Sequence, residues 1–270
     1  MLKLYFDFYD YCVMRFFVLT YQLFVWFPLF LIATILTAII VIVGCFLGGE
    51  RFFSFYPGMY WSKFTCFISL CPVKIKGREN LMKNQSYIFI SNHQGAYDIF
   101  LIYGFLNVPI KWVMKQKLRK IPFVGKACEK AGFIFVDNSS PKAAIKTIAE
   151  AEAKLKNGAS IVIFPEGSRS LTGKLDKFKK GAFQMSLDLK LPIVPVTING
   201  TFEVMPRGSL RLNPHKIEMI IHEPILIEDI PTENSREIAV NIRTLSEKSK
   251  QEIESSLWEK YKCSENQNNL

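Results

Sequence analysis

The chain has 270 residues, of which 49% are apolar and 14% aromatic, and its formal net charge is +10. Its length allows one large domain or two small ones with a buried core, and a composition both apolar and basic favours an anionic membrane surface or anionic substrates. The six Cys form no CxxC pair and the three His are scattered, so the spacing excludes a recognisable zinc site or disulfide framework.

The N-terminal part contains 34 consecutive residues without a charge, between Arg15 and Glu50. A bilayer core needs about 20 apolar residues in a helix, and a signal peptide has only about 7–15. We therefore predict a retained membrane anchor and not a buried soluble helix. Because Pro28 can kink the segment and aromatic residues follow at 52–67, a helical hairpin in one leaflet is the alternative to a span.

After residue 72 the pattern changes to short β-rich runs that alternate with helical ones. This alternation predicts an α/β fold, a layered mixed sheet with flanking helices. The expected strands are 73–77, 86–91, 132–137, 160–164, 193–198 and 216–222; the expected helices are 96–106, 141–158, 179–190 and a C-terminal helix with Ile238, Ile242, Leu245, Ile253, Leu257 and Tyr261 on one face. We assign 1–70 to a membrane-anchoring segment, 71–262 to the α/β domain and 263–270 to a polar tail.

The positive charge is concentrated in the middle of the chain. Residues 111–130 contain seven Lys or Arg and one acid, Glu129. This region fits an anionic partner, and a solvated basic face is the alternative.

The stretch "SNHQGAYDIF" places His93 between an apolar strand and a helix that begins near Asp98. A carboxylate is favoured in the first turn of a helix. Held by Asp98, the imidazole of His93 keeps one tautomer and presents its other nitrogen as a general base near neutral pH. A purely structural His–Asp pair is the alternative.

A serine nucleophile for this base is not recognisable, because the sequence has no GxSxG elbow. The natural proton donor is then a hydroxyl group of the substrate. The substrate would complete a triad of which the protein supplies two members.

A second polar cluster, "FPEGSRS", ends the expected strand at 160–164. Glu166, Gly167, Ser168 and Arg169 are expected at the carboxyl edge of the sheet, where α/β folds bind ligands. The guanidinium of Arg169 suits a phosphate, and Lys177, Lys179 and Lys180 follow near a helix start. A polar turn before a solvated helix is the alternative.

Two further blocks complete the pattern. In "MKQKLRKIPFVG", Lys115 can neutralise an oxyanion or a phosphate, although a surface amphipathic turn explains the block nearly as well. The block "LPIVPVTI" at 191–198 is more typical of architecture than of chemistry.

Together and in this order, the blocks at 92–98, 115–125, 164–170 and 191–196 resemble the four motifs of the glycerolipid acyltransferases, the 1-acyl-sn-glycerol-3-phosphate acyltransferase (lysophosphatidic acid acyltransferase) family with its HXXXXD motif. The resemblance covers about residues 70–200, a span set by those motifs. It implies transfer of a fatty acyl group from acyl-CoA or acyl carrier protein to the free hydroxyl of lysophosphatidate, giving phosphatidate.

Carried over by position, the resemblance makes His93 the general base and Asp98 its orienting partner. Residues 166–169 would hold the glycerol phosphate, and Lys115 would assist at the donor or the oxyanion. Two positions depart from the family pattern: Ser168 replaces Thr, and Asn138 stands where Arg is frequent. The second change weakens the assignment of the acceptor but not the reaction class.

The resemblance implies no metal or redox cofactor and no nucleic-acid partner. The expected partners are the lipid bilayer, a membrane lipid acceptor and the acyl donor, and we expect the catalytic domain on the cytoplasmic side. Three alternatives are left open: an acyltransferase for a lyso-aminolipid or glycerol 3-phosphate, a thioesterase, and a non-enzymatic membrane or nucleic-acid binder.

Overall fold

The computed structural model describes residues 13–136, 155, 159–227 and 234–262. The predicted helix at 141–158 and the polar tail at 263–270 therefore lie outside the described residues, apart from Leu155, and so does Asn138.

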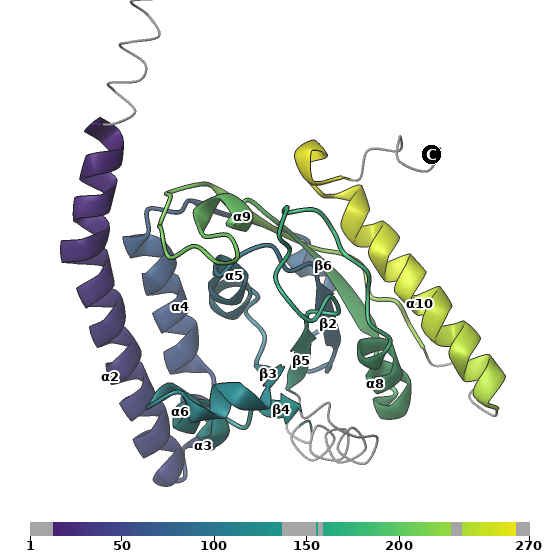
Figure 1. Ribbon diagram of the computed structural model, residues 1–270. Coiled ribbons are helices and arrows are strands. Elements are labelled where there is room, and N and C mark those ends of the chain that lie inside the picture. Colours follow the sequence, from purple (N-terminus) through teal and green to yellow (C-terminus); the bar gives the residue numbers. More distant parts are fainter. Residues whose placement is uncertain (1–12, 137–154, 156–158, 228–233, 263–270) are drawn as a thin grey trace, which may run out of the picture.

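A seven-stranded mixed sheet forms the centre of the molecule (Figure 1), in the order β1-β7-β6-β2-β5-β3-β4. Strands β6, β2, β5, β3 and β4 are parallel; β7 runs antiparallel to β6, and β1 is parallel to β7. The bounds are β1 Val73–Lys76, β2 Ile88–Ser91, β3 Ile110–Lys115, β4 Ile134–Val136, β5 Ser160–Ile163, β6 Ile193–Asn199 and β7 Ile217–Ile221. The predicted fold class is confirmed.

One strand was missed by the sequence analysis. Strand β3 contains "IKWVMK", which we treated only as the start of a basic block. Its burial alternates over the first residues, with Ile110 and Trp112 buried. This half-exposed pattern is typical of a strand near a sheet edge, and it was the signal that could have identified β3.

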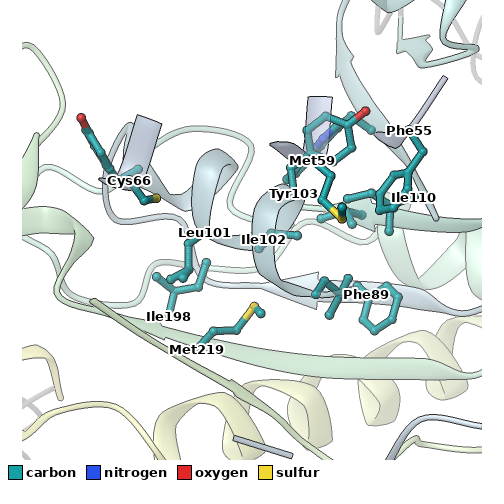
Figure 2. Packing of buried hydrophobic residues seen from close by; sticks show 14 of the residues in the cluster. Phe55, Met59, Cys66, Phe89, Leu101, Ile102, Tyr103, Ile110, Ile198 and Met219 are labelled. Atoms are coloured by element: carbon teal, nitrogen blue, oxygen red, sulfur yellow. The ribbon is translucent and has the colours of Figure 1, made fainter. Parts of the chain in front are cut away.

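Helices cover both faces of the sheet (Figure 1): α4 (Tyr56–Ile68) and α5 (Tyr97–Phe105) lie on one face, and α8 (Gly181–Leu189) and α10 (Ser235–Ser255) on the other. Because side chains alternate along a strand, Phe89 packs in the cluster under α5, whereas Ile88 and Ile90 pack under α8 and α10. Figure 2 shows Leu101 of α5 pointing toward Ile198 and Met219 of the sheet.

The N-terminal segment is one helix over Val13–Phe46, the single helix among the described residues that is long and apolar enough to cross a membrane. It contains a π-helical turn, η1 (Gln22–Trp26), followed by α2 (Phe27–Phe46). Pro28 lacks an amide hydrogen, and the wider π turn accommodates it without a break. Most of the apolar side chains on this helix are exposed.

Two shorter helices follow the long one. After α3 (Glu50–Phe53), helix α4 returns beside α2 (Figure 1). The second helix of the hairpin alternative, over the aromatic residues at 52–67, is thus present, and α2 and α4 form a hairpin that packs on the α/β core.

Helix α10 ends at Ser255, two residues before Leu257, so the predicted C-terminal helix is shorter than expected. Leu257 and Tyr261 are nevertheless buried, with Tyr261 in the short 3₁₀ helix η4 (Glu259–Tyr261). The packing predicted for this face is therefore made by two elements.

Replacing Asn234 with Ala is expected to destabilise the protein by about 1 kcal/mol. The side-chain oxygen of Asn234 accepts hydrogen bonds from the amides of Arg236 and Glu237 at the start of α10. Chemical denaturation of the wild type and the variant measures the difference. Asn234→Asp, which keeps the accepting oxygen, is the control and should retain most of the stability.

Candidate active site

The candidate site lies at the carboxyl ends of three neighbouring parallel strands. His93 follows β2, Glu166 follows β5 and Lys115 ends β3. Parallel strands bring these ends to one edge of the sheet, which is where α/β folds place their ligands. The structure thus brings together the two polar clusters that the sequence analysis identified separately.

The predicted pairing of His93 with Asp98 is present. The Nδ1 atom of His93 lies 2.7 Å from Oδ2 of Asp98, and the same oxygen accepts a 3.0 Å hydrogen bond from the amide of Gly95. The Asp98 side chain is fully buried, whereas that of His93 is 15% exposed. When Asp98 is ionised, Nδ1 carries the hydrogen and Nε2 has the free electron pair of a base.

Glu166 holds the backbone around His93. Its Oε1 accepts a 2.8 Å hydrogen bond from the amide of His93, whereas its buried Oε2 has no hydrogen-bond partner among the described residues. The amide of Ser170 donates to the carbonyl of His93 at 2.7 Å. Both backbone groups of His93 are therefore bound by the 164–170 turn.

Glu166 is buried, and its pKa is raised to about 7. Burial is the main cause, because the charged form loses hydration. The hydrogen bond from the amide of His93 and the nearby backbone of Asp176 oppose this effect, and the charge of Asp98 adds to it. A ligand role for Glu166 toward the acceptor stays a prediction; its contacts show that it supports the His93 turn.

The imidazole plane of His93 is fixed by stacking. Its ring centroid lies 3.9 Å from that of Phe164 with an interplanar angle of 9°, and Phe164 in turn stacks on Trp112 of β3 at 5.7 Å. Neither aromatic residue has a role in the predictions made from the sequence. Phe164 opens the "FPEGSRS" block, but its partner is distant in the chain and no local pattern indicates it.

Asn92, also without an assigned role, connects the catalytic turn to β6. Its side-chain amide donates to the carbonyl of Ile198 and accepts from the amide of Ile198, both at 2.8 Å. The side chain thereby mimics a strand residue and extends the sheet pairing by one position. In the sequence, only the position of Asn92 directly before His93 indicated that it belongs to the site.

Gly167 makes the turn that presents Ser168 and Arg169. Its φ of +73° lies in the region that favours glycine, and a Cβ there would meet Nζ of Lys179 at 2.6 Å. The ammonium group of Lys179 therefore lies against this turn. Arg169 is half-buried. Because the next residue, Ser170, bonds to the carbonyl of His93, Arg169 and Lys179 both lie close to the His93 loop.

Lys115 lies at the same sheet edge but with an exposed side chain, where β3 passes into the 3₁₀ helix η3 (Gln116–Lys120). Its predicted role at the donor or the oxyanion stays a prediction. No cluster of three or more His, Cys, Asp or Glu that could hold a metal ion occurs in the part of the chain that the structure describes.

This sheet edge, with its His–Asp pair and cationic turn, lies within a recognised domain: residues 72–199 match the Acyltransferase family model. This part of the chain is an acyltransferase-family domain, and the resemblance stated from the motifs is confirmed.

Within that family the chain is similar to 1-acyl-sn-glycerol-3-phosphate acyltransferases. It is 34% identical over 181 residues to the chloroplastic LPAT1 of Arabidopsis thaliana, covering 65% of this chain and 49% of the relative. It is 34% identical over 174 residues to the Saccharomyces cerevisiae enzyme, covering 63% and 57%. The chain thus spans about half the length of these curated relatives.

A solved structure agrees with the fold. The crystal structure of the 1-acyl-sn-glycerophosphate acyltransferase PlsC from Thermotoga maritima aligns with a TM-score of 0.61 and 29% sequence identity. The alignment covers 84% of this chain and 97% of that one. The likeness therefore extends beyond the domain matched by the family model.

Proposed function

We propose that the protein transfers a fatty acyl group from a thioester donor, acyl-CoA or acyl carrier protein, to the sn-2 hydroxyl of 1-acyl-glycerol-3-phosphate, giving phosphatidate. The observation that carries the proposal is the bond from His93 to the buried Asp98 beside the cationic 164–170 turn. The names of the relatives support the choice of acceptor.

In the proposed reaction Nε2 of His93 removes the proton of the acceptor hydroxyl while that oxygen attacks the thioester carbonyl carbon. The tetrahedral oxyanion collapses, the carbon–sulfur bond breaks, and the thiolate leaves with the proton that His93 took up. Asp98 stabilises the imidazolium formed in between. Lys115 is the proposed cation for the donor or the oxyanion.

The acceptor phosphate is proposed to bind at the 164–170 turn. Arg169 offers the planar fork that matches a phosphate, and Lys179 lies against the same turn. The hydroxyl of Ser168 is a further donor.

We propose that residues 1–70 hold the enzyme at the membrane and that residues 71–262 form the catalytic domain on the cytoplasmic side, where acyl donors are made. The helix over Val13–Phe46 supports attachment by its length and its exposed apolar surface. An acceptor that stays in the bilayer can then reach the site from the lipid.

The test uses the purified full chain in phospholipid vesicles with labelled acyl-CoA. Separate reactions contain lysophosphatidate, glycerol 3-phosphate, a lyso-aminolipid or no acceptor. We expect labelled phosphatidate with lysophosphatidate and little product otherwise. Labelled free fatty acid formed equally with and without acceptor would identify a thioesterase and overturn the proposal.

Arg169→Ala is expected to raise KM for lysophosphatidate about 10- to 100-fold, the loss of one charge-assisted bond to the phosphate. The slow hydrolysis of the donor without acceptor should not change, because that reaction involves no acceptor phosphate. Initial rates over a range of lysophosphatidate concentrations measure the effect. Arg243→Ala is the control, since Arg243 is an exposed residue of α10 that pairs with Glu247 at 2.8 Å.

A further inference from the structure

A buried hydrogen-bond network joins the anchor helix to the catalytic helix, and it is centred on Ser69 at the end of α4. The Nε1 atom of Trp26 lies 2.8 Å from Oγ of Ser69, and the hydroxyl of Tyr97 lies 2.5 Å from the same atom. Oγ of Ser69 donates to the carbonyl of Thr65 at 2.6 Å. Ser69 and Tyr97 are fully buried, and Trp26 is nearly so.

The direction of each bond in this network follows from the chemistry of its groups. An indole N–H can only donate, and a hydroxyl has one hydrogen and two acceptor positions. Because Ser69 uses its hydrogen on the carbonyl of Thr65, it accepts from both Trp26 and Tyr97. The hydroxyl of Ser69 is thus fully used, and a fully satisfied buried network rigidifies the segments that it joins.

The network ends next to the candidate base. Tyr97 is the first residue of α5 and directly precedes Asp98, whose carboxylate holds His93. Trp26, at the other end, belongs to the π turn of the anchor helix. Through Ser69, the side chain of Trp26 in the N-terminal helix is therefore connected to Tyr97, the residue directly before Asp98.

The π turn makes a second connection to the same site through Gln22. Its side chain accepts from the amide of Leu212 at 2.9 Å and donates to the carbonyl of Leu210 at 2.5 Å. Earlier in that loop, the carbonyl of Met205 accepts a 3.0 Å bond from the amide of Ala96, inside the catalytic turn. Both connections start in one helical turn and end between His93 and Asp98.

We propose that Trp26, Ser69 and Tyr97 are positioning residues that make the geometry of the His93–Asp98 pair depend on the anchor helix. The inference rests on the proposed function. It implies that the anchor contributes to turnover as well as to membrane attachment.

A matched control lies on the same helix. Tyr103 is also a buried residue of α5, and its hydroxyl also bonds to the N-terminal hairpin, at the carbonyl of Ser54 at 3.3 Å. It is six positions from Tyr97 and has no bond to the network around Ser69 or to Asp98 among the contacts described. Tyr103→Phe therefore removes a comparable hydroxyl away from the pair.

The experiment compares Tyr97→Phe and Tyr103→Phe in the full chain, reconstituted in vesicles with acyl-CoA and lysophosphatidate. We expect Tyr97→Phe to lower kcat about 10-fold with KM for both substrates unchanged, because the substrates still bind while the base is misplaced. Tyr103→Phe should stay within about twofold of the wild type. Vesicle flotation and thermal unfolding are measured for each variant.

Equal kcat values for the two variants, at equal membrane binding, would overturn the inference and reduce the network to a structural role. If Tyr97→Phe does not fold, Ser69→Ala, which removes only the shared hydroxyl oxygen of the network, decides by the same comparison. A wild type without acyl transfer overturns the proposed function. An active wild type with unaffected variants overturns only the role of the network.

Discussion

His93→Ala is expected to lower kcat by about 10³-fold, within the range for removing a general base. The imidazole of His93 is bonded to the buried carboxylate of Asp98 at 2.7 Å, beside the cationic turn. The measurement is single-turnover transfer of a labelled acyl group to lysophosphatidate. Transfer at a rate close to that of the wild type would exclude His93 as the base.

The control for this variant is His215→Ala. The ring of His215 bonds through Nδ1 to the carbonyl of its neighbour Lys216 at 2.8 Å and is assigned no part in the reaction. Its removal should leave kcat within about twofold of the wild type. A non-enzymatic membrane binder would behave differently: the wild type would transfer no acyl group, and His93→Ala would leave membrane binding unchanged.

The second large effect concerns Glu166 and pH. Burial raises the pKa of Glu166 to about 7 from an ordinary value of 4.5. The folded state therefore binds more protons than the unfolded state between these values, so its stability falls as pH rises through this window. The contribution of protonated Glu166 to the free energy of unfolding is complete below about pH 4.5 and lost above about pH 7. This contribution is roughly 3 kcal/mol in total.

Glu166→Gln removes this titration and keeps an oxygen for the amide of His93. The free energy of unfolding of the wild type should fall from pH 5 to pH 8 by roughly 2.5 kcal/mol more than that of the variant. Urea unfolding at both pH values provides the comparison, and other titrating groups cancel in the difference. Parallel pH dependence of the two proteins would show that Glu166 titrates at its ordinary value.

Much of the fold followed from local pattern. The fully buried runs of β2 and β6 and the apolar helix after Ala96 are continuous in the chain. The pairing of His93 with Asp98 was predictable because Asp98 follows His93 by five positions, across one turn. Strand β3 was missed because its segment was interpreted only by the charge of Lys111 and Lys115, and the apolar residues between them were not considered.

The support of the site was not predictable in the same way. Glu166 lies 73 positions from His93, and Asn92 lies 106 positions from its partner Ile198. Such bonds depend on strand order, in which β2 lies between β5 and β6, and nothing in the sequence states that order. The Ser69 network adds a bond between Trp26 and Ser69, 43 positions apart, and from Ser69 it reaches Tyr97 of α5.

The hydrogen bonds on both sides of the His93 backbone have a consequence for selectivity against water. Since the amide of His93 is held by Glu166 and its carbonyl by Ser170, the base is preorganised before either substrate arrives. In the proposed reaction, discrimination between the alcohol and water would then depend on how completely the lipid acceptor displaces solvent around the free imidazole nitrogen.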